Sequence, residues 1–542
     1  MSKLIVTLFL LAIFVSCTQP KKENRKVIVV HARGISYPEM QEYLTATKSD
    51  LFFKRNEKNI TKLTPITNAV TISNIASFET GESPSEHGIV GHLYVKKENE
   101  KLSLVSGFSQ PFETETFWEK ADLKGKKVLN IGSLTLHGKY ITHKNVDALS
   151  QGTQIGKPII LELKQISSND NSLVKYRNSN DEFKIPELQN LVVYKTKDSQ
   201  LIFDNDYNFD NGFVKEATLG NWFELDNNLK GKWLNKSSDS IQIYVRPQYK
   251  NKGYPKEFIQ SINENIGNPT GWPNIGYYTS KKIDSKTLLE EIYSELNHIM
   301  KVFTSTSQKK EYDLIMIDYP LMDRIGHSFL GLKKSSKEIQ LEYKNAFSQM
   351  DKDFNTIEAF AKKNNYDLII TSGHGFSPIH TSIDINKFLT KNSVNTNFNS
   401  KDWEAIGIPA KVSSHIYIND NLSIENKQKT LKKIEDAFSY LKYKDELVVD
   451  EIYRREDLNK IGLDHKNSGD LFVLLNPGYL FENNSNEKTF WGVPKFRGDH
   501  GYSLKHKESY GIFISKIKCH DCHSIDISKT IEKRLFTDYS SN

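Results

Sequence analysis

Buried strands alternate with long helices through the middle of the sequence. Helical patterns at 284–303 and 335–363 each lie next to a short apolar, β-branched run, at 312–319 and 366–372. A similar run at Lys26–His31 indicates the first strand. Units of this kind favour a parallel sheet, because each helix returns the chain across one face of the sheet. The sequence therefore predicts the α/β class, with a central, mainly parallel sheet and helices on both faces.

Two segments depart from this pattern and define the predicted domains. Residues 165–270 are rich in Asn, Asp, Lys and Ser and have only short strand patterns, and residues 385–465 form a second departure. We expect the first to be an insertion and the second a cap segment. The core then comprises residues 26–164, 271–384 and 466–535, which is long enough to bury a large apolar interior.

The N-terminus has the pattern of an export signal. A basic start, residues 1–3, precedes an apolar run at 4–15 that is too short for a stable membrane-spanning helix. The run ends in FVSC, which resembles a bacterial lipobox whose cysteine, Cys17, becomes the lipidated first residue. We expect a signal peptide at 1–16 and a lipoprotein tether at 17–25, so that the mature protein is exported and lipid-anchored to a bacterial membrane, in the periplasm or at the cell surface. An ordinary cleaved signal peptide is the alternative.

Changing Cys17 to alanine tests this localisation. The variant should be released or misprocessed, because it lacks the side chain that would carry the acyl chains holding the protein to the bilayer. Cell fractionation followed by a mass measurement of the mature chain gives the result. A Cys17→Ala protein that stays in the membrane fraction with unchanged processing would contradict the lipobox.

The charge balance does not favour a nucleic-acid-binding protein. The 542 residues include 73 Lys and Arg against 67 Asp and Glu, for a net charge of +6. The sequence has no block of basic residues with interleaved aromatic residues, which a nucleic-acid groove would require. A lysine-rich, solvated surface accounts for this composition.

Two cysteines near the C-terminus raise a separate question. Cys519 and Cys522 lie in KCHDCHSIDIS, which matches the attachment signal for c-type haem. The surrounding sequence has no pattern of a small haem domain. A local disulfide or a surface metal clip is therefore favoured over haem.

Several polar residues that could carry chemistry lie at predicted strand ends and in loops. In α/β proteins, ligand sites form where the ends of strands meet loops. These residues are His31, Arg33, Thr71, Asn74, Asp323, His327, His374 and His500.

The spacing of Asp323 and His327 indicates a metal site. Residues four apart face the same side of a helical turn, so the two could bind one cation together. His500 could complete a set of two histidines and one carboxylate, which suits zinc with one position left open. His374 differs, because Gly373 and Gly375 flank it and no carboxylate stands beside it.

Six motifs, in order along the chain, resemble the type I phosphodiesterase/nucleotide pyrophosphatase branch of the alkaline phosphatase superfamily. The resemblance covers roughly residues 26–160 and 285–535. It implies an alkaline-phosphatase-like fold and a metal-dependent phosphoester hydrolase acting on a small phosphorylated substrate. The motifs are TISNIASFETGESPSEHGIVGH, FWEKADLKGKKVLNIG, YPLMDRIGH, DLIITSGHG, GDLFVLLNPGYLFE and GDHGYS.

The resemblance also implies roles for individual residues. Thr71 matches the nucleophile of the family, and Asn74 belongs to the same motif. Asp323, His327 and His500 match the complete ligand set of one metal ion.

The second metal site of the family is incomplete in this sequence. Thr71 and His374 match two of its ligands, but Arg33 and Gly373 stand where the family has aspartates. A dication facing Arg33 would be repelled with no anion to offset the charge. We therefore expect about one zinc ion per chain.

Two functions follow from this incomplete site. In the first, the Arg33 guanidinium replaces the missing metal by holding phosphoryl oxygens, and His31 or His374 serves as the base for Thr71. In the second, the chain is a degenerate member that binds a phosphorylated or sulfated ligand without turning it over. A structural salt bridge is the alternative role for Arg33. The hydrolase is favoured, because Thr71, Asn74 and one full ligand set are present.

Overall fold

The computed structural model describes most of the chain. The described residues are 25–98, 101–135, 143–170, 173–178, 192–196, 200–204, 215–224, 229–236, 240–483, 488–519 and 522–537. The predicted signal peptide and all but the last residue of the predicted tether lie outside them. Among the described helices, none is long and apolar enough to cross a bilayer.

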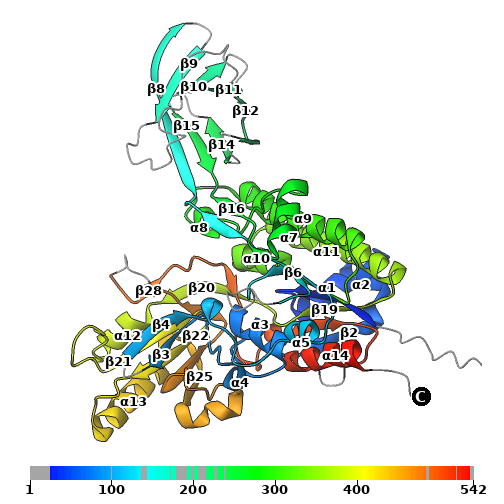
Figure 1. Ribbon diagram of the computed structural model, residues 1–542. Coiled ribbons are helices and arrows are strands. Elements are labelled where there is room, and N and C mark those ends of the chain that lie inside the picture. The colour runs from blue at the N-terminus through cyan, green and yellow to red at the C-terminus, as the bar shows by residue number, and fades with distance from the viewer. Residues whose placement is uncertain are drawn as a thin grey trace, which may run out of the picture.

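An eight-stranded mixed sheet forms the centre of the protein (Figure 1). Its five middle strands, β6, β5, β18, β1 and β19, run parallel, and the outer pairings are antiparallel. This confirms the predicted mainly parallel sheet. In spatial order the strands are β17 (Gly253–Tyr254), β6 (Val146–Ser150), β5 (Val128–Ser133), β18 (Leu314–Tyr319), β1 (Lys26–Ala32), β19 (Tyr366–Ser372), β30 (Gly511–Ile514) and β2 (Ile60–Leu63).

Helices cover both faces of this sheet, as predicted. Alternate residues of β1 point to opposite faces, so that Ile28 and Val30 join one apolar cluster and Val27 and Val29 join the other. The first face is covered by α1 (Tyr37–Ala46), α2 (Phe52–Arg55), α9 (Ser285–Lys309), α10 (Leu321–Phe329) and α11 (Lys337–Lys363). The second is covered by α3 (Thr71–Thr80), α5 (Phe117–Leu123) and α14 (Ser524–Phe536).

The predicted helix at 284–303 forms and continues to Lys309 as α9. Asp284 caps it, because its side chain accepts a hydrogen bond of 2.7 Å from the backbone N–H of Thr287. One face carries apolar residues, including Leu288, Ile292 and Val302, that pack into the core. This amphipathic pattern explains why the sequence alone located the helix.

A second, antiparallel sheet projects from the core as an arm (Figure 1). Its strands run from Ile159 to Val245, so the arm begins and ends before the predicted insertion of 165–270 does. The chain rejoins the core at β17, which pairs with β6, and α7 (Lys256–Asn265) packs there through Ile262. The arm consists of β8 (Ile159–Asp170), β9 (Leu173–Asn178), β10 (Val192–Thr196), β11 (Gln200–Asp204), β12 (Lys215–Thr218), β13 (Trp222–Glu224), β14 (Lys230–Lys236) and β15 (Ser240–Val245).

The predicted cap segment folds around a third sheet. The sheet contains β21 (Ala405–Ala410), β22 (Ser413–Ile418), β26 (Leu471–Leu475) and β25 (Val449–Arg454), in that order, with α12 (Ile385–Lys391) and α13 (Ile424–Ser439) packed against it. Strand β26 comes from beyond the predicted boundary at residue 465 and lies between β22 and β25. The cap is therefore completed by a strand that the sequence pattern had placed in the core.

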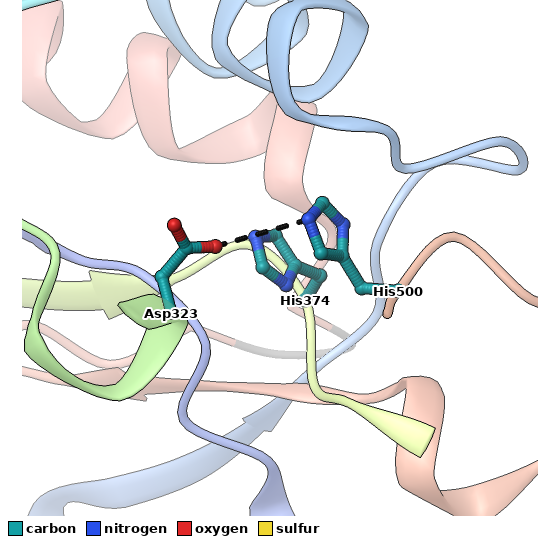
Figure 2. Close-up of side chains that lie close together, drawn as sticks. All are labelled: Asp323, His374 and His500. Atoms are coloured by element: carbon teal, nitrogen blue, oxygen red, sulfur yellow. Dashed lines mark ion pairs between the residues drawn. The ribbon is translucent and has the colours of Figure 1, made fainter. Parts of the chain in front are cut away.

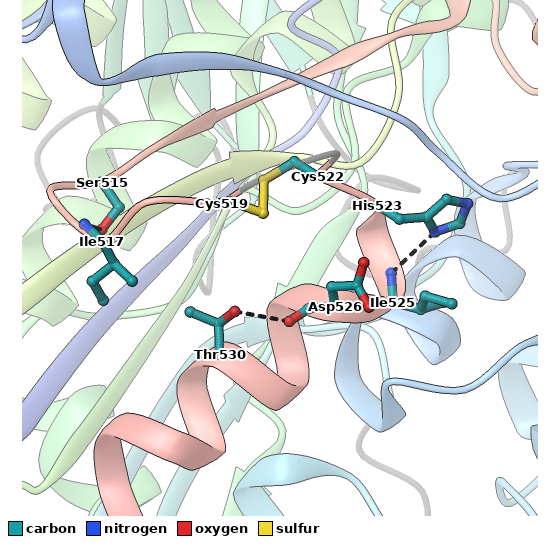
Figure 3. The surroundings of a disulfide bond; sticks show 8 residues. All are labelled: Ser515, Ile517, Cys519, Cys522, His523, Ile525, Asp526 and Thr530. Atoms are coloured by element: carbon teal, nitrogen blue, oxygen red, sulfur yellow. Dashed lines mark hydrogen bonds between the residues drawn. A yellow bond between two sulfur atoms is a disulfide. The ribbon is translucent and has the colours of Figure 1, made fainter.

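Cys519 and Cys522 form a disulfide just before α14 (Figure 3). Backbone hydrogen bonds join this segment to the loop after β2, since Thr64 N–H donates to Cys522 O and Ser524 N–H donates to Thr64 O. Of the three chemistries considered for these cysteines, the structure contains the local disulfide.

Candidate active site

The site forms where three neighbouring parallel strands end. Strands β18, β1 and β19 lie side by side, so the residues that follow them meet at one edge of the sheet. Arg33 follows β1, Asp323 lies on α10 after β18, and His374 follows β19. His500 follows β29 (Gly498–Asp499) and approaches from the segment before β30. All four side chains are almost completely buried.

Asp323 faces a group of histidine rings (Figure 2). Its Oδ1 atom lies 3.6 Å from His327 Nε2 and 3.8 Å from His500 Nε2. The His374 ring is stacked on the His500 ring, with centroids 3.6 Å apart. Asp323, His374 and His500 thus form one possible ligand group, whose ligand atoms all lie within 4.8 Å of one another. The predicted triad is also brought together around Asp323 Oδ1, which both His327 and His500 approach.

Hydrogen bonds orient the three imidazoles. In each ring, the Nδ1–H group donates a hydrogen bond to a backbone carbonyl oxygen. His327 donates to Gly498 at 3.0 Å, His500 to Ala69 at 2.7 Å, and His374 to Gly375 at 3.1 Å. A neutral imidazole that donates from Nδ1 keeps its lone pair on Nε2. The three rings therefore offer Nε2 as a ligand atom.

Burial keeps these rings neutral. It lowers the pKa of both His327 and His500 to about 4, although the Asp323 charge opposes the shift. Burial likewise lowers the pKa of His374, and the neighbouring His500 adds to the effect. Neutral imidazole is the form that binds zinc, so the protonation state suits a metal centre.

The residues present fit one metal ion. Asp323 Oδ1 and His374 Nε2 are buried and have no hydrogen-bond partner among the described residues. Such atoms are costly to bury unless something else binds them. Zinc–ligand bonds of about 2.0–2.1 Å place tetrahedral ligand atoms about 3.4 Å apart, close to the separations found here.

Asp499 is a site residue that the sequence interpretation missed. Its Oδ1 lies 3.9 Å from His500 Nε2 and 4.0 Å from His327 Nδ1, and the three residues form a second possible ligand group. The Lys411 ammonium stands 3.8 Å from Asp499 Oδ2. The sequence feature that could have identified Asp499 is its position directly before His500 in GDHGYS.

Arg33 is bound by two buried carboxylates. Its Nε and Nη2 donate to the two oxygens of Asp318 at 2.9 and 3.1 Å, and its Nη1 donates to Asp323 Oδ2 at 3.0 Å. Only 1% of the Arg33 side chain is exposed. These contacts correspond to the structural salt bridge that the sequence left open, with Asp318 as a partner that the sequence interpretation did not identify.

A second arginine shares Asp323 with Arg33. Arg324 Nη1 donates to Asp323 Oδ2 at 3.0 Å, and Arg324 also makes a two-point contact with Glu295 on α9. Burial acts to raise the pKa of Asp323, but the charges of Arg33 and Arg324 outweigh it, so the pKa lies well below its usual value. Asp323 is therefore ionised, with Oδ2 held by arginines and Oδ1 left for a cation.

The residues of the second metal site do not fit an ion. A Cβ added at Gly373 would lie 2.3 Å from Asn74 Nδ2, so the Asn74 amide occupies the space of the missing aspartate side chain. Both amide atoms of Asn74 are buried without a hydrogen-bond partner among the described residues. With the Arg33 guanidinium beside it, this position has neither the anions nor the room that a dication needs.

Thr71 is the first residue of α3 and is half-buried. The preceding Val70 has no side chain that can cap the helix, so the backbone N–H groups of the first turn are available to an anion. The hydrogen bond from His500 to Ala69 ties the start of α3 to the metal cluster, and Asn74 lies one turn further along the helix. Thr71 therefore stands at a helix end without a side-chain cap, two residues after the carbonyl that accepts the His500 hydrogen bond.

The comparisons agree with this description of the fold. Phosphonoacetate hydrolase from Sinorhizobium meliloti 1021 is 12% identical in its complex with phosphonoformate, with a TM-score of 0.54 over 94% of this chain and 96% of that chain. Its complex with phosphonoacetate gives 11% identity and a TM-score of 0.53 over the same shares. These similarities confirm the predicted alkaline-phosphatase-like fold.

A further structural match is murine ectonucleotide pyrophosphatase/phosphodiesterase 5, at 13% identity and a TM-score of 0.48 over 96% of this chain and 97% of that chain. The comparison with curated protein sequences finds no match. The family model described as type I phosphodiesterase/nucleotide pyrophosphatase matches residues 52–503, which is most of the chain. The chain therefore belongs to the type I phosphodiesterase/nucleotide pyrophosphatase family.

Proposed function

We propose that this chain is an exported, membrane-anchored phosphoester hydrolase that uses one zinc ion and the hydroxyl of Thr71. The observation that carries the proposal is the buried Asp323 Oδ1, which has no hydrogen-bond partner among the described residues and faces the Nε2 atoms of His327 and His500. Family membership supports hydrolysis as the reaction class.

Asp323, His327 and His500 would hold the ion, with His374 beside them. When bound there, zinc would supply a Lewis acid toward a phosphoryl oxygen. The open N-terminus of α3 would bind other phosphoryl oxygens through its backbone N–H groups and hold phosphorus next to Thr71. Small phosphate esters are therefore the substrate class that this site suits.

Thr71 Oγ1 would form a bond to phosphorus as the bond to the leaving oxygen breaks. The Thr71 proton goes to a buried imidazole. His31 has an Nε2 without a hydrogen-bond partner among the described residues, whereas the Nε2 of His374 faces the metal position. The imidazole passes this proton to the leaving oxygen. Water then attacks phosphorus and gives a proton to the same imidazole, which returns it to Thr71 as the Oγ1–phosphorus bond breaks. Arg33 takes no part in these steps, because its contacts with Asp318 and Asp323 make it a positioning residue for Asp323.

A phosphate-binding protein without turnover is the second candidate function. It is favoured by one observation: Arg33 and the Asn74 amide fill the position where the family has its second metal. A threonine without that metal is a weaker nucleophile, since an arginine in ion pairs does not lower the hydroxyl pKa as a bound dication does.

Hydrolysis of p-nitrophenyl phosphate, bis(p-nitrophenyl) phosphate and ATP by the purified protein tests the proposal. Hydrolysis should require zinc, and Thr71→Ala should reduce it to background, because Thr71 carries the hydroxyl at the first position of α3. Thr356→Ala, an exposed threonine on α11, is the matched control and should leave the rate unchanged. Turnover that survives in the Thr71→Ala variant would rule out Thr71 as the nucleophile. Absent turnover together with zinc-dependent AMP binding would favour the binding protein.

A further inference from the structure

A polar groove lies where the arm meets the core, apart from the residues of the candidate active site. It has a volume of about 770 Å³ and lies between helix α9 and the base of the arm, where Lys230 of β14 and Arg246, the residue after β15, line it. Figure 1 shows α9 at the base of the arm. Volumes of this size are typical of pockets for small organic ligands.

The arm is fixed to α9 next to this groove. The indole N–H of Trp222 donates to Glu290 at 2.8 Å, and Lys232 forms an ion pair with the same carboxylate. Tyr244 O–H donates to Glu291 at 2.7 Å. These contacts between buried or half-buried side chains hold the walls of the groove in place without a ligand.

One wall carries a guanidinium that lacks an ionic partner. Arg246 lines the groove and lies over the Trp222 ring, 5.7 Å from its centroid, and it makes no side-chain hydrogen bond or ion pair with any described residue. Glu291, the carboxylate that attracts it, already accepts hydrogen bonds from Tyr244 and Asn274. Burial lowers the pKa of Arg246, which is the direction expected of a cation that has lost water without gaining an anion.

His298 contributes a second unsatisfied group to the same groove. Its side chain is only 9% exposed, and its Nε2 has no hydrogen-bond partner among the described residues. Burial lowers the pKa of His298 to about 4, so the ring is neutral and can still exchange one hydrogen bond with a ligand. A nearly buried polar atom without a partner, on a side chain that lines the groove, is a group that a bound ligand could satisfy.

The remaining lining suits a hydroxylated ligand. Lys230, Lys286 and Lys301 add positive charge around Arg246, whereas Glu338 and Glu342 lie on α11 at the other side. Glu290, the other acid of the groove, is occupied by Lys232 and Trp222. The polar and aromatic side chains that complete the lining are Thr270, Tyr293, Ser294, Asn268 and Asn297.

We propose that this groove binds a small organic anion, a sugar or similar polyhydroxylated compound that carries a phosphate, sulfate or carboxylate group. Arg246 pairs with the anionic group, His298 hydrogen-bonds to the ligand, and the hydroxyl and amide side chains contact its hydroxyl groups. This binding site is independent of the hydrolytic function, because it shares no residue with the zinc cluster.

Titration calorimetry on the full mature chain tests this site, with glucose 6-phosphate, glucose 6-sulfate and glucuronate as probes and glucose as the uncharged control. At least one anionic sugar should bind at millimolar concentration or below, and glucose should not. Arg246→Gln and His298→Gln should each weaken that binding about tenfold or more, since each removes a desolvated hydrogen bond. Lys309→Gln, an exposed residue of α9 outside the groove, is the matched control and should bind as the native chain does.

Arg246→Gln should leave ligand binding at the zinc cluster unchanged. A loss of binding in this variant therefore reports on the groove alone. If Arg246→Gln lowers the thermal stability so far that it unfolds, His298→Gln and Lys230→Gln provide the same comparison. The proposal is overturned if none of the three anions binds to the native chain, or if the groove variants bind them as tightly as Lys309→Gln does.

Discussion

Asp323→Ala is expected to abolish zinc binding and hydrolysis and also to lower the free energy of unfolding of the zinc-free protein by about 3–5 kcal/mol. The first effect follows from the loss of Oδ1, a buried carboxylate oxygen that faces His327 and His500 and has no hydrogen-bond partner among the described residues. The second follows from Oδ2, which accepts hydrogen bonds from both Arg33 and Arg324. Without the Asp323 carboxylate, Arg33 would retain only Asp318 as an ionic partner, and Arg324 would retain only Glu295.

Zinc content by plasma emission spectrometry and urea unfolding measure the two effects separately. His500→Ala is the control, because it removes a metal ligand and leaves both arginine contacts with Asp323 intact. It should lose zinc but lose much less stability in the zinc-free state. Asp323→Ala protein that retains zinc would show that the ion binds elsewhere.

The pH dependence of folding stability gives an independent measure of what the Asp323 carboxylate contributes. The folded-state pKa of Asp323 is below its ordinary value, so its contribution to stability is present above the unfolded pKa of about 3.9. That contribution is lost as the pH falls from there toward the folded pKa. Zinc-free native protein should therefore lose more stability below about pH 4 than Asp323→Ala does.

Arg33→Asp combined with Gly373→Asp is expected to raise the zinc content from about one ion to about two per chain. The first change replaces a buried cation with an anion beside Asp318 and Asp323. The second adds a carboxylate next to His374, and the Asn74 amide must rotate away because it lies 2.3 Å from the new Cβ. That displacement moves only the end of a side chain that makes no hydrogen bond among the described residues.

The double variant should also become dependent on zinc for stability. Without metal, the two introduced carboxylates and those of Asp318 and Asp323 repel one another, and the unfolding temperature should fall below that of the native chain. Saturating zinc should restore it, since an ion at a hundred times its dissociation constant stabilises the folded state by about 2.7 kcal/mol.

Gly373→Asp alone is the control for the double variant. It retains the Arg33 charge and should bind no additional zinc. If the reaction is hydrolysis, the double variant should also turn over nitrophenyl esters faster than the native chain. Two zinc ions in the native chain would contradict the assignment of Arg33 to this position.

The sequence predicted the parts of the site that depend on local spacing or on strand ends. Asp323 and His327 are one helical turn apart, so their proximity required only that 321–329 be helical, which α10 confirms. Arg33 and His374 follow apolar strands whose ends are visible in the pattern, and the parallel sheet places them together.

What the sequence could not predict depends on pairing between distant segments. Arg33 and its partner Asp318 are 285 residues apart, and only the register of β1 against β18 brings them into contact. The start of the arm at Ile159 was missed for a similar reason, because the first residues of β8 are apolar and resemble core until they pair with β15. The position of the Asn74 amide against Gly373 depends on how α3 packs, which no single segment encodes.

The ion pair of Arg33 with Asp318 and Asp323 has a consequence for how the protein depends on its surroundings. A bound ion is in equilibrium with the medium and leaves when chelators or scarcity lower its concentration, whereas a guanidinium is attached to the chain and is always present. At this position the balance of charge is set when the polypeptide is synthesised and does not vary with metal supply. With the single zinc site proposed above, the medium would have to provide one cation instead of two, and Arg33 would keep the carboxylates around it neutralised in a zinc-poor environment.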